Sequence, residues 1–175
     1  SGTVIWRSRR KLAAGEIGEN EFFDAACASA PSAGHCNTMG TASTMNAVAE
    51  APGLSLPGCA AIPAPYRERG QIAYETGKRI VEMVWEDLKP SDILTRKAFE
   101  NCIVVNSAIG GSTNAPIHIN ALARHIGVEL SIDDFQKVSD RIPFIADLKP
   151  SGKYVMEDLH HVGGTPAVMK YLIEK

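Results

Sequence analysis

The sequence predicts a helix-rich region with few strands. Apolar residues recur at spacings of three and four positions over most of the chain, capping residues precede these segments, and glycines or prolines end them. Continuous apolar runs typical of strands are confined to two short segments, at 58–62 and 142–148. We therefore expect helices to account for most of the ordered structure in the 175 residues.

The N-terminal part of the chain predicts two short helices followed by a loop. The first helix, of about ten residues, begins at the capping residues 1–3 and is ended by Gly15. A second helix opens at Asn20. Segment 28–36 is built from small residues and contains Pro31, which predicts a loop.

The next segments predict a helix, a connector and the clearest helix of the chain. Residues 38–51 indicate a loop that passes into a helix, which Pro52 should end. Segment 54–65 has three prolines and almost no charge, which predicts a buried connector with a short strand at 58–62. Segment 66–88 carries an apolar stripe of helical period, formed by Ile72, Gly77, Ile80, Val81, Val84 and Leu88.

The second half of the chain predicts further helices and one strand. Gly127 should end one helix at its C′ position, and Ser131 should cap the next. Residues 142–148 are the best strand candidate, followed by a turn at 149–152. The helices are expected at 98–105, 113–126, 131–138, 155–161 and 166–174.

The composition narrows the class of protein. Hydrophobic residues make up 45%, charged residues make up 22%, and the net charge is −2, so intrinsic disorder is excluded. The near-neutral charge does not favour nucleic-acid binding, and no apolar run is long enough to span a bilayer. Segment 1–12 is too basic for a secretory signal. We expect a cytoplasmic location, or an organelle in a eukaryote, with no nucleic-acid or membrane partner.

One of the four cysteines lies in a context that suggests chemistry. Cys36 is in the glycine-flanked segment GHCNTMGT, which leads into a helix N-terminus whose N–H groups would stabilise a thiolate. Such a thiolate can bind a metal or an iron–sulfur cluster, and a small buried thiol is the alternative interpretation. We interpret the other cysteines as packing residues: Cys27, Cys59 and Cys102.

A glycine pair at a predicted helix start gives the second candidate site. Gly110 and Gly111 precede Ser112, Thr113 and Asn114, an arrangement that can hold a carboxylate or phosphate. An ordinary glycine-rich helix junction with an N-cap explains the pattern equally well. A P-loop is excluded, because no Gly-Lys-Ser/Thr follows.

The histidines indicate no chelating pair. His118 and His125 are seven positions apart, too far to bind one ion as an i, i+4 pair would. His160 and His161 are adjacent and are expected to diverge around a helix. Each imidazole is interpreted as an ordinary core or surface side chain.

Four long motifs resemble one known family. The chain is similar to the IlvD/EDD dehydratases, which include dihydroxy-acid, phosphogluconate and sugar-acid dehydratases. Its first two-thirds resemble the sugar-acid branch, whereas the part after about Ser131 resembles the branched-chain amino-acid branch. The motifs are GHCNTMGTASTMNAVAEA at 34–51, LPGCAAIPAPYRERG at 56–70, NSAIGGSTNAPIHINALA at 106–123 and DLKPSGKYVMEDLHHVGG at 147–164.

The resemblance implies a larger α/β enzyme with helices layered around a mainly parallel sheet. Residues 1–175 would form a single region of its N-terminal iron–sulfur domain, with few strands. The family converts a 2,3-dihydroxy acid into a 2-keto-3-deoxy acid and water, uses an iron–sulfur cluster and Mg²⁺, and forms homo-oligomers. A sugar-acid substrate is favoured, and a dihydroxy-acid dehydratase of branched-chain amino-acid biosynthesis is the alternative.

The resemblance also assigns residues. Three cysteines hold the family's cluster, and Cys36 matches the third; a 2Fe–2S cluster is favoured over 4Fe–4S. The Mg²⁺ ligands and the catalytic base match no segment of this chain, so no catalytic residue is expected in it. Residues that support the ligand or contact substrate are expected among His35, Asn37, Thr38, Ser112, Thr113 and Asn114.

Two hypotheses that place the protein in other functional classes stay open. The chain starts without methionine and stops in mid-helix, which suggests an excerpt, and an excerpt could act as a non-catalytic helical module that binds a partner chain. The apolar connector 54–65 would then contribute to the binding surface. A phosphate-binding protein that uses 110–114 is the third hypothesis.

Overall fold

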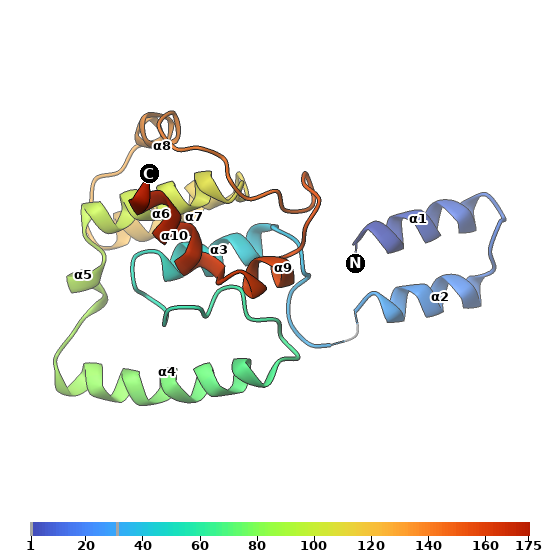
Figure 1. Cartoon of the computed structure of the whole chain (residues 1–175), viewed down its shortest axis with the longest axis horizontal. Coiled ribbons are helices and arrows are strands. Elements are labelled where there is room, and N and C mark those ends of the chain that lie inside the picture. The colour runs from blue at the N-terminus through green and yellow to red at the C-terminus, as the bar shows by residue number, and fades with distance from the viewer. Residues whose placement is uncertain (1, 31) are drawn as a thin grey trace. The chain divides into compact units, whose positions relative to one another are not determined.

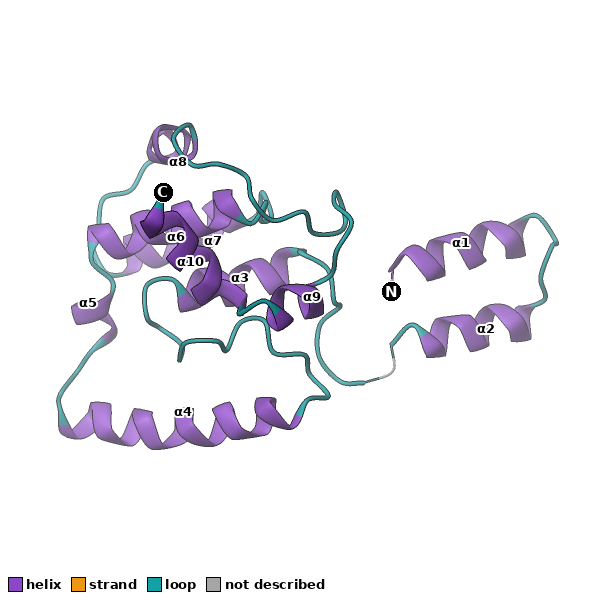
Figure 2. Cartoon of the chain, in the orientation of Figure 1, coloured by secondary structure: helices purple, strands orange, loops and turns teal. Residues whose placement is uncertain are grey.

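The computed structural model describes residues 2–30 and 32–175 and divides the chain into two units, residues 1–37 and 38–175. Ser1 and Pro31, which the sequence placed in a helix cap and a loop, lie outside the described residues. Helices joined by turns and loops make up both units (Figure 2). The helix-rich prediction is therefore confirmed.

Unit 1, residues 1–37, is a helical hairpin. Helix α1 (Gly2–Ala13) and helix α2 (Glu19–Ala28) contact each other along their lengths (Figure 1). Basic residues occupy the last turn of α1 and acidic residues the first turn of α2, where each sign complements the helix macrodipole. No described residue of either helix is fully buried, so the hairpin has no core of its own.

Unit 2, residues 38–175, contains eight described helices, and their boundaries follow the capping and breaking residues of the sequence. Gly127 has a φ of 74°, as the predicted C′ position requires, and Ser131 is the N-cap residue of its helix and donates its N–H to the Asp134 carboxylate. The helices are α3 (Thr41–Glu50), α4 (Arg67–Trp85), α5 (Pro90–Ile93), α6 (Arg96–Ala108), α7 (Ala115–His125), α8 (Ile132–Ser139), α9 (Met156–His161) and α10 (Gly164–Glu174).

Helix α6 lies at the centre of unit 2. It packs against α3, α7, α8 and α10, and its residues Phe99 and Ile103 are 1% and 0% exposed. Two apolar clusters share this helix, because Val105 and Ala108 belong to one and Phe99 and Ile103 to the other. The core of unit 2 therefore forms around α6, with α3 packed along it.

Helix α4 is different, because none of its described residues is buried. It is the longest described helix, with 19 residues, and it runs along one edge of unit 2 (Figure 1). The predicted helix is confirmed, but its apolar stripe does not face the core. Ile80, Val81 and Val84 are 54%, 55% and 74% exposed.

Neither predicted strand forms. Segment 58–62 makes consecutive turns, and the N–H groups of Gly58 and Ala60 bond to a side chain instead of a neighbouring strand. Segment 142–148 has the residue types of a strand but no strand beside it, and its Ile145 and Ala146 N–H groups bond to Ala108 O at the end of α6. In the described part of the chain, one isolated bridge, between Leu148 and Tyr154, is the sole β-type pairing.

The buried connector predicted at 54–65 is buried only at Ala60, Ala61 and Ile62, whereas Leu54, Pro57, Ala64 and Pro65 are exposed. No described helix is both long and apolar enough to cross a lipid bilayer.

Candidate functional site

The segment that carries Cys36 lies at the end of unit 1. Cys36 is exposed, as the adjacent His35 is, so the small-buried-thiol interpretation does not hold for this residue. His35 Nδ1 lies 2.8 Å from Cys36 O and fixes the imidazole against the local backbone. Helix α3 begins five residues further along the chain, as the sequence predicted for a loop that leads into a helix.

The start of α3 is held by two bonds within unit 2. Ser43 Oγ donates to Thr38 O at 2.7 Å, which folds the residue after Asn37 back onto the first turn of the helix. Met39 N donates to Lys149 O at 2.7 Å. The first family-like motif is thereby joined to the fourth, 147–164.

A second set of bonds joins α3 to the glycine pair. Thr44, which is fully buried, accepts a bond from Ser112 N at 2.9 Å. Thr41 Oγ1 lies 3.0 Å from Ser112 Oγ and accepts a bond from Asn114 Nδ2 at 2.9 Å. These hydroxyl and amide groups form one polar cluster between the first motif and the third.

The glycine pair is a packing junction. The N–H groups of Gly110, Gly111, Ser112 and Asn114 are each bonded within the protein, so the segment does not present a ready anion cradle. A Cβ at Gly111 would overlap the Asn106 Oδ1 atom and lie 2.9 Å from Thr44 Cγ2. This geometry favours the helix-junction interpretation over phosphate binding.

The predicted cap at the start of α7 has a different form from the one expected. Asn114 is the N-cap residue, but its side chain makes no capping bond and reaches Thr41 instead. Ser112 Oγ accepts from Asn114 N at 3.1 Å. Thr113, also predicted as a site residue, is exposed in the same loop.

At its other end α3 carries a buried carboxylate. Glu50 is 6% exposed and accepts bonds from Gly58 N and from Ala60 N, the latter at 2.8 Å. Burial raises the pKa of Glu50, and the two backbone bonds partly oppose that rise. Glu50 thus joins the first motif to the second, in which Cys59 lies between the two bonded residues.

The remaining cysteines differ in surroundings. Cys59 is half-buried and accepts a bond from Arg69 Nη1 at 3.5 Å. Cys102 is buried in α6, where burial raises the pKa of its thiol to about 12, which confirms it as a packing residue. Cys27 is exposed on α2 and so is not a packing residue as the sequence suggested.

A fourth junction joins the second motif to the last. Tyr66 OH donates to Glu157 Oε1 at 2.5 Å, and this bond raises the pKa of the Tyr66 hydroxyl. The rings of His160 and His161 lie 5.7 and 6.4 Å from the Tyr66 ring. The two imidazoles are 5.8 Å apart and share this contact, so the prediction that they diverge is wrong.

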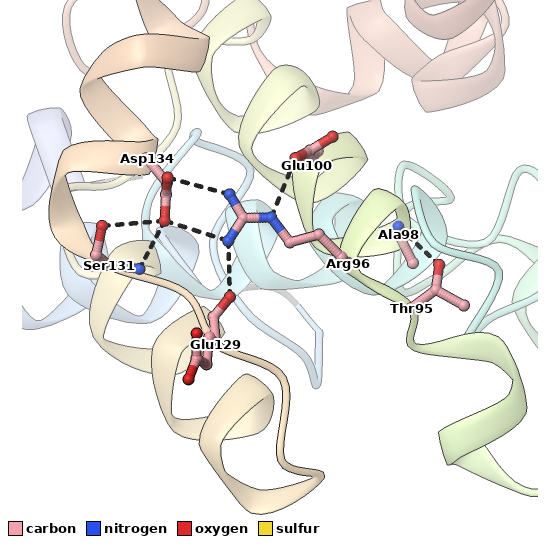
Figure 3. A network of polar contacts seen from close by, with 7 residues as sticks. All are labelled: Thr95, Arg96, Ala98, Glu100, Glu129, Ser131 and Asp134. Atoms are coloured by element: carbon pink, nitrogen blue, oxygen red, sulfur yellow. Dashed lines mark hydrogen bonds and ion pairs between the residues drawn. The ribbon is translucent and has the colours of Figure 1, made fainter.

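A polar network outside the four motifs fixes α8 against α6 (Figure 3). Arg96 bonds Glu100 at 3.1 Å, Glu129 O at 2.7 Å and both carboxylate oxygens of Asp134. Asp134 also accepts the N–H and hydroxyl of Ser131. The arginine and these two bonds hold the pKa of Asp134 well below its usual range. All the groups are satisfied by one another, which indicates a structural clamp.

The sequence did not single out three polar residues of this site, all of which lie in α3: Thr41, Thr44 and Glu50. One signal was available for Glu50, because it follows Ser43 and Ala47 at helical spacing on the face that is buried. A carboxylate on a buried helix face needs partners. The partners themselves, in a loop eight to ten residues further on, could not be read from the sequence.

An exposed thiol has the chemistry of one ligand of an iron–sulfur cluster. Cys36 offers an exposed sulfur. Within residues 2–30 and 32–175, no three His, Cys, Asp or Glu side chains are close enough together to hold a metal ion.

Comparison with known proteins identifies the family to which the four motifs belong. The family model of the dihydroxy-acid/6-phosphogluconate dehydratase N-terminal region matches residues 2–175. The D-xylonate dehydratase of Caulobacter vibrioides is 66% identical over 175 residues, which cover 100% of this chain and 29% of that protein.

Dihydroxy-acid dehydratases are also similar. The mitochondrial enzyme of Aspergillus fumigatus is 50% identical over 161 residues, which are 92% of this chain and 27% of that protein. The chloroplastic enzyme of Arabidopsis thaliana is 48% identical over 169 residues, which are 97% of this chain and 28% of that protein. The chain thus spans between 27% and 29% of the length of these relatives.

The chain belongs to the IlvD/EDD dehydratase family and corresponds to its N-terminal region.

Proposed function

We propose that this chain is part of a hydro-lyase that converts a 2,3-dihydroxy sugar acid into a 2-keto-3-deoxy acid and water. The observation that carries the proposal is the 66% identity to a D-xylonate dehydratase over 175 residues. The packing of all four motifs around α3 supports it, because the residues that identify the family are also the residues that hold this unit together.

Within that enzyme, Cys36 is the residue of this chain that would bind the iron–sulfur cluster, for which we favour the 2Fe–2S form. A cluster held by three thiolates leaves one iron open to act as a Lewis acid on a hydroxyl leaving group. The remaining cluster ligands, the Mg²⁺ ligands and the catalytic base are assigned to other parts of the longer enzyme.

The neighbouring residues would position that thiolate. His35 is bonded to the Cys36 carbonyl, and Thr38 is bonded through its own carbonyl to Ser43, so the backbone on both sides of Asn37 is restrained. Asn37 and Thr38 directly follow Cys36 in the sequence, and we assign their side chains to the support of its thiolate or to substrate contact. Ser112, Thr113 and Asn114 are further candidates for substrate contact, and within unit 2 Ser112 and Asn114 hold the first turn of α3 through Thr41.

A second candidate is a dihydroxy-acid dehydratase of branched-chain amino-acid biosynthesis. The observations that favour it are the identities of 48% and 50% to such enzymes and the resemblance of the part after Ser131 to that branch. The two candidates share one reaction and differ in the acid that they bind.

A chimeric enzyme tests both. Residues 1–175 replace the matching segment of the D-xylonate dehydratase of Caulobacter vibrioides, and keto-acid formation is measured with D-xylonate and with a 2,3-dihydroxy branched-chain acid. We expect turnover of D-xylonate. Turnover of the branched-chain acid alone would support the second candidate, and a folded chimera with normal iron content but no turnover of either acid would contradict both.

The role of Cys36 is tested in the same chimera. Cys36→Ser should abolish turnover and lower bound iron and sulfide, because one of three cluster thiolates is lost. Cys27→Ser is the matched control, since Cys27 is also exposed, and it should leave both quantities unchanged. Equal losses in the two variants would refute the assignment. The isolated 175-residue chain, given iron, sulfide and Mg²⁺, should show no turnover.

The longer enzyme is further proposed to be a homo-oligomer that acts on a small-molecule acid, without a nucleic-acid or membrane partner. We place it in the cytoplasm, or in an organelle in a eukaryote.

A further inference from the structure

Two consecutive hydroxyl side chains of α3 are completely buried. Ser43 and Thr44 lie among the first four residues of the helix, and both are 0% exposed. Serine and threonine form helices less readily than alanine, and a buried hydroxyl lowers stability unless it has a hydrogen-bond partner. The groups that these two hydroxyls bond therefore indicate what they contribute.

The bonds of the two hydroxyls lead out of their helix. Thr76 on α4 and Ser107 on α6 each donate to the carbonyl four residues earlier in the same helix. A hydroxyl inside a helix commonly bonds in this way. Ser43 and Thr44 bond instead to two segments that α3 does not contain. Each bond therefore fixes a neighbouring segment against α3.

Ser43 holds the segment that follows Cys36. Its Oγ donates to Thr38 O at 2.7 Å, and Thr38 is two positions after Cys36. Two residues of chain span at most about 7 Å, so a fixed peptide group at Thr38 restricts the positions that the thiol can reach. Met39 N, which donates to Lys149 O at 2.7 Å, holds the next residue as well.

Thr44 holds the loop after the glycine pair. Its Oγ1 accepts from Ser112 N at 2.9 Å, and its Cγ2 methyl would lie 2.9 Å from a Cβ at Gly111. The same hydroxyl donates to Met39 Sδ at 3.4 Å. Thr44 therefore joins the segment after Cys36 to the loop 112–114, which contains the candidates for substrate contact.

We propose that Ser43 and Thr44 are positioning residues of the dehydratase site. Ser43 holds Cys36 where its thiolate can bind the iron–sulfur cluster, and Thr44 holds the loop 112–114 where it can contact the acid substrate. The inference rests on the proposed function, because that function assigns the cluster to Cys36 and substrate contact to the loop. Together the two hydroxyls fix residues 38–39 and the loop relative to each other.

The chimeric enzyme tests the role of Ser43 through its bound iron. Ser43→Ala should release iron to a chelator about two- to tenfold faster, the range expected for the loss of one hydrogen bond, and should leave the KM for the acid substrate unchanged. Ser107→Ala is the matched control, because Ser107 also donates to a backbone carbonyl, at 2.8 Å, but within α6. It should change neither quantity. Release from Ser43→Ala that is no faster than from the control overturns the role of Ser43.

The same enzyme tests the role of Thr44 through its substrate. Thr44→Val keeps the shape of the side chain and removes the hydroxyl, so it should raise the KM for the acid substrate about two- to tenfold. Thr44→Ser keeps the hydroxyl and should keep the KM close to the wild-type value. Thr165→Val is the matched control, because Thr165 is also 0% exposed but its hydroxyl has no partner within the described residues. Equal KM values for the two valine variants, or for Thr44→Ser and Thr44→Val, overturn the role of Thr44.

Failure of this inference can be told apart from failure of the proposed function. A wild-type chimera that binds no iron, or that turns over neither acid, contradicts the proposed function and overturns both positioning roles with it. A wild-type chimera with iron and turnover, whose variants behave like their controls, contradicts the positioning roles alone. Thermal unfolding checks each variant. A variant that does not fold shows that its hydroxyl is required for the fold itself, which also overturns its role as a positioning residue.

Discussion

The sequences of α6 and α4 both strongly favour a helix, yet α6 lies in the core and α4 is exposed to solvent. Six of the 13 residues of α6 are buried, whereas none of the 19 described residues of α4 is. Both carry apolar residues at helical spacing. Apolar periodicity therefore predicts that a helix forms, but it does not predict whether this chain or another one covers the apolar face.

The contrast also separates two kinds of glycine. Gly111, just after α6, is crowded by Asn106 and Thr44, and the absence of a side chain lets three segments meet. Gly77, within α4, has empty space around it. Packing inside unit 2 therefore explains why a glycine stands at position 111, and it gives no reason for a glycine at position 77.

The largest difference should appear on truncating one isoleucine from each helix. Ile103→Ala should lower the free energy of unfolding by about 2–5 kcal/mol, because Ile103 is fully buried and the deletion leaves a cavity. Ile80→Ala, at a position that is 54% exposed, should change it by less than about 1 kcal/mol. Urea unfolding of dilute protein measures both values, and similar losses would mean that α4 is covered within one chain.

The two glycines provide the next test. Gly111→Ala should lower the free energy of unfolding by about 1–3 kcal/mol, because its Cβ would force Asn106 or Thr44 to move. Gly77→Ala should raise the stability of the dilute monomer by about 0.5–1 kcal/mol, since alanine is the better helix former in open space. Thermal unfolding gives the direction of each change, and a destabilising Gly77→Ala would contradict the open environment.

The smallest effect is a difference in pH dependence between two carboxylates. Burial raises the pKa of Glu50 above 4.5, so its charged form disfavours the fold, and the stability that it contributes falls as pH rises from 4.5 through the raised value. Arg96 and Ser131 lower the pKa of Asp134 below 3.8, so its contribution is present above 3.8 and is lost as pH falls below that value.

Urea unfolding across the acid range separates the two groups. Glu50→Gln should remove the loss of stability that wild-type protein shows as pH rises above 4.5. Asp134→Asn should remove the loss of stability that it shows as pH falls below 3.8. Glu50→Gln also lowers stability throughout, because one backbone N–H loses its acceptor. Identical pH profiles for the two variants would contradict the opposite directions of the pKa shifts.

Most of the fold could be predicted from local signals. Caps and breakers such as Gly127 and Ser131 set the helix boundaries, because they act within a few residues of their position. The segment 142–148 misled the prediction, since its β-branched and aromatic residues match a strand and the described residues contain no neighbouring strand to pair with it. Pairing is a non-local property that residue type does not encode.

The candidate site was predictable in part for the same reason. The motif residues Ser112 and Asn114 could be singled out from a glycine pair before a helix. Their partner Thr41, 71 residues from Ser112, could not be, since nothing local to α3 indicates which loop reaches it. The assignment of Cys36 as a cluster ligand stays a prediction from the family resemblance.

The bonds that join the four motifs limit how relatives can be recombined. Two of these bonds depend on side-chain identity: the Thr44 hydroxyl accepts from Ser112 N, and the Tyr66 hydroxyl donates to Glu157. Any crossover between positions 44 and 157 separates at least one of these pairs and assembles halves from different parents. Crossovers outside that interval keep every pair from one parent. Libraries that exchange whole blocks should therefore give far more folded progeny than libraries that exchange single motifs.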